Sequence, residues 1–63
     1  MNAEIIETPD MNNGYRWVVQ VEGESNLTYL SGVGAPKSRK VGDRGTLTYR
    51  SSSSRGGYFW MDL

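Results

Sequence analysis

The residues best equipped for chemistry are cations and aromatic rings in the second half of the chain. Four basic residues fall between positions 37 and 44, and two arginines flank the serine run at 51–54. An aromatic segment at 58–60 follows that run. Cations bind phosphate or carboxylate groups, while exposed rings stack on bases or anchor protein interfaces. The predicted binding residues are Lys37, Arg39, Lys40, Arg44, Arg50, Arg55, Tyr58 and Trp60.

Catalytic and metal chemistry lack the side chains they need. The chain contains no histidine and no cysteine, so the usual nucleophile and base pairs, disulfides and zinc ligand sets are missing. The serines at 51–54 have no base near them in sequence, and Glu22 and Glu24 supply too few oxygen ligands for a calcium loop. The sequence therefore predicts no enzyme, no catalytic residue, no metal and no cofactor.

Charge divides the chain into halves of opposite sign. Residues 1–31 hold five acidic side chains and one basic one, whereas residues 32–63 hold six basic and two acidic ones, and the formal net charge is +0. The halves either form two faces of the folded domain or intermix and neutralise each other. A net charge of zero argues against a dedicated nucleic-acid binder, which usually carries a basic excess.

Apolar alternation and turn signals predict five short strands, with no helix longer than a single turn around 36–40. Pro9 and Asn12–Gly14 end the first strand and reverse the chain, and Gly23 marks the next turn. A change to Gly, Pro, Ser and basic residues makes 32–44 the longest loop. The strands are expected at Ala3–Thr8, Tyr15–Glu22, Leu27–Leu30, Thr46–Arg50 and Tyr58–Met61.

The second strand has the clearest buried face. Tyr15, Trp17, Val19 and Val21 alternate with polar residues, interrupted only by Val18. Successive side chains of a strand point to opposite faces. We therefore expect these four alternate residues to line the core.

The last strand is apolar on both faces, although only one of them can point into a barrel. We expect Phe59 and Met61 to point inward. Tyr58 and Trp60 then lie outside the core, available to a partner.

Five short strands in 63 residues favour a single all-β domain, residues 1–63, whose five-stranded antiparallel sheet closes into a small barrel. The segment Val41-Gly42-Asp43, followed by Leu47, a polar loop and Tyr58-Phe59-Trp60, resembles the part of SH3 domains where a Gly-Asp turn precedes a strand, a distal loop and an aromatic pair. The upstream half has no counterpart of that family's ALYDY segment or acidic specificity loop, so proline-rich peptide binding is not carried over. An OB-like barrel is the alternative.

Binding is the function that these features favour. Exposed aromatic residues beside cations suit a protein interface or a homo-oligomer, and they equally suit single-stranded nucleic acid. The zero net charge places a protein partner first and nucleic acid second. The chain also resembles, in its size and style, small accessory proteins encoded by phages and prophages, which modulate host proteins. Without a signal segment, cysteine or apolar span, we expect a cytoplasmic protein with no membrane contact.

Overall fold

The computed structural model describes residues 1–51 and 57–63. Arg55, one of the predicted binding residues, lies outside the described residues. The strands are β1 (Asn2–Glu7), β2 (Trp17–Val21), β3 (Leu27–Leu30), β4 (Arg44–Arg50) and β5 (Gly57–Asp62). Two short 3₁₀ turns, η1 (Met11–Asn13) and η2 (Gly32–Gly34), interrupt the loops. No helix in this part of the chain is long and apolar enough to cross a membrane.

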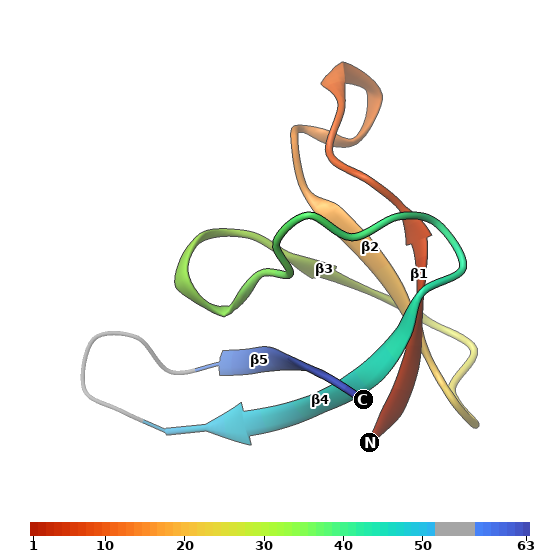
Figure 1. Cartoon of the computed structure of the whole chain (residues 1–63), viewed down its shortest axis with the longest axis vertical. Coiled ribbons are helices and arrows are strands. Elements are labelled where there is room, and N and C mark those ends of the chain that lie inside the picture. The colour runs from red at the N-terminus through yellow and green to blue at the C-terminus, as the bar shows by residue number, and fades with distance from the viewer. Residues whose placement is uncertain (52–56) are drawn as a thin grey trace.

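The five strands form one antiparallel sheet in the order β3-β2-β1-β4-β5. Strands β1 to β3 follow one another as neighbours, and the long connection after β3 then brings β4 back beside β1, which is a Greek-key arrangement. Figure 1 shows the sheet curling so that the connection passes close to β5. The prediction of an all-β, five-stranded antiparallel fold is confirmed. The predicted closure into a barrel is not observed, because β3 and β5 remain the two edges of the sheet.

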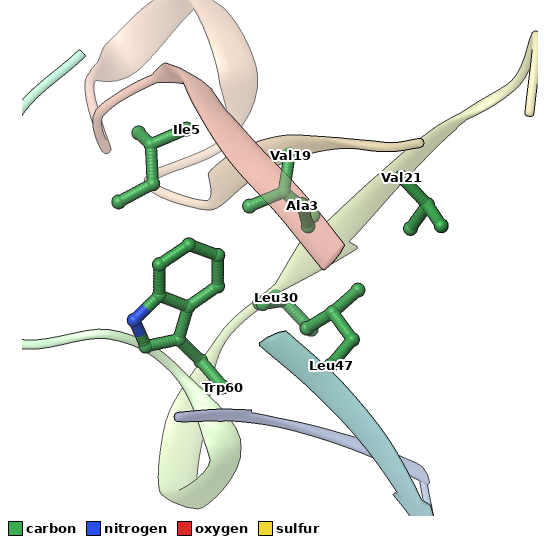
Figure 2. Packing of buried hydrophobic residues seen from close by; sticks show 7 residues of the cluster. All are labelled: Ala3, Ile5, Val19, Val21, Leu30, Leu47 and Trp60. Atoms are coloured by element: carbon green, nitrogen blue, oxygen red, sulfur yellow. The ribbon is translucent and has the colours of Figure 1, made fainter. Parts of the chain in front are cut away.

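All five strands contribute to one small core on the inner face of the curved sheet. Across the β4–β5 pair, Leu47 lies opposite Trp60, and across β1–β2, Ile5 lies opposite Val19. Figure 2 shows the indole of Trp60 facing these aliphatic side chains. The cluster consists of Ala3, Ile5, Val19, Val21, Leu30, Leu47 and Trp60, with Trp17 and Ala35 packed against it.

The buried face predicted for the second strand holds for its centre and fails at its start. Val19 and Val21 are in the core and Trp17 packs on it, but the Tyr15 side chain is 68% exposed. Tyr15 has a φ of 59°, in the left-handed region, so it belongs to the turn and not to the alternating strand. Val18, which interrupts the pattern, is buried although it lies outside the main cluster.

The loop between β1 and β2 is organised by one buried amide. The backbone N–H groups of Asp10 and Arg16 donate to Asn13 Oδ1, and Asn13 Nδ2 donates to the Thr8 carbonyl at 2.9 Å. Asp10 in turn caps η1 by accepting from the backbone of Asn12 and Asn13. This network fixes the path of the chain into β2 and also places Arg16, whose Nε donates to the Asn13 carbonyl.

Candidate binding surface

The last strand turns its indole into the core, which is the opposite of the orientation we expected. Trp60 is only 9% exposed, whereas Met61 is 53% exposed and Phe59 is half-buried. The physical reason lies on the neighbouring strand, because Gly45 has no side chain and the Trp60 ring occupies the space beside its Cα. The prediction that Phe59 and Met61 point inward and leave Trp60 exposed is therefore wrong.

Tyr58 is exposed, as predicted, and it has an aromatic partner. Its ring is 40% exposed and meets Tyr49, directly across the ladder, in an edge-to-face arrangement with centroids 5.4 Å apart. Tyr49 is 62% exposed. Both rings share the face of Leu47 and Trp60, one step further along the hairpin, so the aromatic face continues past the core into solvent.

The opposite face of the same hairpin also carries exposed apolar surface. Phe59 and Met61 lie on it, and the Arg50 guanidinium carbon sits 5.7 Å from the centroid of the Phe59 ring. This is the range of a cation–π contact. We call these residues of the two faces, Tyr49 and Tyr58 on one and Arg50, Phe59 and Met61 on the other, the hairpin surface.

The predicted cationic residues of the long loop lie in different parts of the structure. Arg39 pairs with Asp62 of β5, with 2.6 Å between Nη2 and Oδ2. Arg44 lies 3.3 Å from Glu4 and 3.5 Å from Glu22, so it belongs to the acidic strands β1 and β2. Lys40 is exposed. At Arg44 and Arg39 the charges therefore intermix, and the described cations do not gather into a single rim.

The segment after β3 covers the outer edge of β5 and forms a cleft there. Gly34 packs so closely on this edge that a Cβ at its position would lie 2.5 Å from the Tyr58 carbonyl oxygen. Trp60 Nε1 donates to Asp62 Oδ1 at 2.8 Å, which joins the indole to the Arg39–Asp62 pair. The cleft measures about 300 Å³ and is lined by Val33, Ala35, Pro36, Lys37, Arg39, Trp60 and Asp62.

A second contact between a cation and an aromatic ring lies on the outer face of β2 and β3. None of the binding residues predicted from the sequence lies there. The Arg16 guanidinium carbon lies 4.5 Å from the centroid of the exposed Tyr29 ring. Arg16 is the lone cation of the acidic half, and no local sequence signal links it to a residue thirteen positions away. Tyr49 was also missed, although its place opposite Tyr58 follows once the hairpin register is known.

Comparisons with known proteins find no family profile, curated protein or solved structure that matches this chain. Within the described residues, no group of three or more acidic side chains is placed to hold a metal ion.

Proposed function

We propose that this chain is a non-catalytic binding module that engages a protein partner, or a second copy of itself, through the hairpin surface. The observation that carries the proposal is the edge-to-face pair of tyrosines, Tyr49 and Tyr58, exposed where the hairpin extends past the core. Tyrosine, phenylalanine, methionine and arginine are the residue types enriched at protein interfaces, and they compose this surface. Rigid rings also lose little conformational entropy when a partner covers them.

The charge distribution supports a protein partner over a polyanion. Arg44 is committed to Glu4 and Glu22, and Arg39 to Asp62, so each of these cations lies beside a carboxylate. A phosphate backbone that approached Arg44 would also meet two acidic side chains. Affinity for nucleic acid depends on cations that neutralise phosphates, and these pairs reduce it.

A differential capture experiment tests the proposal. The chain carrying Tyr49→Ser and Tyr58→Ser is compared as bait with the unchanged chain and with Tyr15→Ser, which alters a tyrosine that is more exposed than either and lies far from them in the sequence. Bacterial lysate is the first source of partners, given the resemblance to phage accessory proteins. We expect a partner that binds the unchanged chain and Tyr15→Ser and is lost with the double variant.

Self-association is measured on the same three proteins by sedimentation velocity. A dimer that dissociates only in the double variant supports a homo-oligomer. A monomeric chain that captures no protein through Tyr49 and Tyr58 refutes the proposal.

Single-stranded nucleic acid is the second candidate, and the Arg50–Phe59 contact, on the other face of the hairpin from the two tyrosines, favours it. Base stacking on such rings contributes about 1 to 3 kcal/mol per base. This candidate predicts binding to mixed oligonucleotides at low salt that weakens as salt rises, because phosphate contacts release counterions. Fluorescence anisotropy measures it, and an absence of binding at low salt excludes it.

We infer that the curved sheet is an open barrel of OB-like type, the alternative to the SH3-like type. A five-stranded, partly open Greek-key barrel describes OB-folds, and the order β3-β2-β1-β4-β5 agrees with it. A cytoplasmic location and a phage-type role as a modulator of a host protein complete the proposal. The absence of cysteine suits a reducing compartment.

A further inference from the structure

We propose that the cleft between the segment after β3 and strand β5 binds a small organic molecule that carries one carboxylate on a short apolar body. This site is separate from the hairpin surface, and it does not depend on a protein partner. Ligand pockets combine apolar walls with a few polar groups that set orientation, and their volumes begin near 300 Å³. The cleft, at about 300 Å³, lies at the lower end of that range, and its lining is mixed, with four apolar or aromatic residues and three charged ones.

The apolar part of the ligand has a defined place. Pro36 is buried, Ala35 packs against the core, and Trp60 lines the cleft together with them. Val33, which also lines the cleft, is largely exposed. These side chains offer contact to a short hydrocarbon chain, and the small volume of the cleft leaves no room for a large ring system.

The charges of the cleft select a single negative charge. Lys37 and Arg39 contribute two cations, and Asp62 contributes one carboxylate. One positive charge is therefore uncompensated, and it matches a carboxylate better than a phosphate monoester, which carries nearly two negative charges at neutral pH. Arginine also presents a planar fork of N–H donors that fits carboxylates, and Arg39 already binds Asp62 with one of them.

The backbone between the two cations supports a site at this position. Ser38 has a φ of 54°, which an L-residue with a side chain rarely adopts. Strained conformations of this kind concentrate at ligand-binding segments, where the surrounding structure enforces them. Here the strained residue stands between the two cations that line the cleft.

The indole N–H signal of Trp60 in a ¹⁵N NMR spectrum reports on the cleft, and Trp17→Phe assigns it. Butyrate is titrated as the probe. Butylammonium, which has a similar hydrocarbon chain but a positive charge, and inorganic phosphate, an anion without a hydrocarbon chain, are the controls. We expect a saturable shift of the Trp60 signal with butyrate alone. The absence of a saturable shift overturns the proposal, as does an equal response to phosphate or butylammonium.

Substitutions test the assigned charges. Lys37→Met should weaken butyrate binding about tenfold, as expected for the loss of a charged hydrogen-bond partner. Lys40→Met, at an exposed lysine that does not line the cleft, should leave binding unchanged. Asp62→Asn removes the competing negative charge and retains an acceptor for Trp60, so it should tighten binding. Equal weakening by the two lysine variants, or weaker binding by Asp62→Asn, overturns the proposal.

A second titration, with peptides, distinguishes a peptide C-terminus from a free acid as the source of the carboxylate. A tripeptide that ends in valine is compared, as the free acid and as the C-terminal amide, with butyrate. If the free acid binds more tightly than butyrate and the amide does not bind, the site takes a peptide terminus. If butyrate binds more tightly, the site takes free acids. Equal binding of acid and amide contradicts carboxylate recognition.

Discussion

Gly45→Ala should destabilise the fold because it places a methyl group where the Trp60 indole lies. A Cβ built on Gly45 would sit 2.7 Å from Trp60 Cε2 and 2.5 Å from the Met61 carbonyl oxygen. Both distances are far below van der Waals contact, and neither a backbone oxygen nor a core ring can move freely. Overpacking of this kind costs about 1 to 3 kcal/mol. A domain of this length has a total stability of only about 3 to 9 kcal/mol, so the loss is a large part of it.

Urea unfolding followed by circular dichroism measures the effect. With an m-value of about 1 kcal/mol per M, the midpoint should fall by about 1 to 3 M. Thr48→Ala, on the exposed face of the same strand, is the control and should change stability by less than about 0.5 kcal/mol.

A double-mutant cycle isolates the contact between the methyl group and the indole. Trp60→Phe removes the outer part of the indole, so Gly45→Ala should cost about 1 kcal/mol less in that background. An unchanged midpoint in Gly45→Ala would show that Trp60 does not occupy the space beside Gly45. An equal cost in both backgrounds would refute the contact with the indole as the cause and leave the Met61 carbonyl oxygen as the obstacle.

Two further substitutions test the loops that frame the sheet. Asn13→Ala should lower the free energy of unfolding by about 1 to 3 kcal/mol in urea melts, because its buried amide joins several backbone groups, whereas exposed Asn12→Ala should cost much less. Gly34→Ala should push η2 away from the Tyr58 carbonyl and uncover Trp60, which acrylamide quenching of tryptophan fluorescence detects. Unchanged quenching would mean that the segment after β3 does not shield the indole.

The placement of charge has the clearest consequence for function. The two halves of the chain differ in sign, which left open a basic face that could attract nucleic acid. Arg44 instead lies beside Glu4 and Glu22, because β4 pairs with β1 and so enters the acidic half of the sheet. These pairs are exposed and each contributes less than about 1 kcal/mol to stability. Their importance is that they remove positive charge from any phosphate-binding surface.

Local sequence was sufficient to predict the strands, because each depends on alternation and on the turn residues beside it. The third strand, Leu27–Leu30, agrees at both ends, and the other four lie within two residues of their predicted bounds. The prediction was wrong for Tyr15. It continues the alternating pattern, yet it lies in a turn, because the buried Asn13 network sets the backbone there.

The sequence by itself determined an all-β chain of five strands, with no histidine or cysteine for catalysis or metal binding. Tertiary structure decided which face of the last strand is buried. Both faces of that strand are apolar, so alternation cannot distinguish them, and the choice depends on Gly45 of the neighbouring strand, which alone leaves room for the Trp60 ring. The cleft likewise exists only because the segment after β3 folds back over β5 and joins residues far apart in the chain.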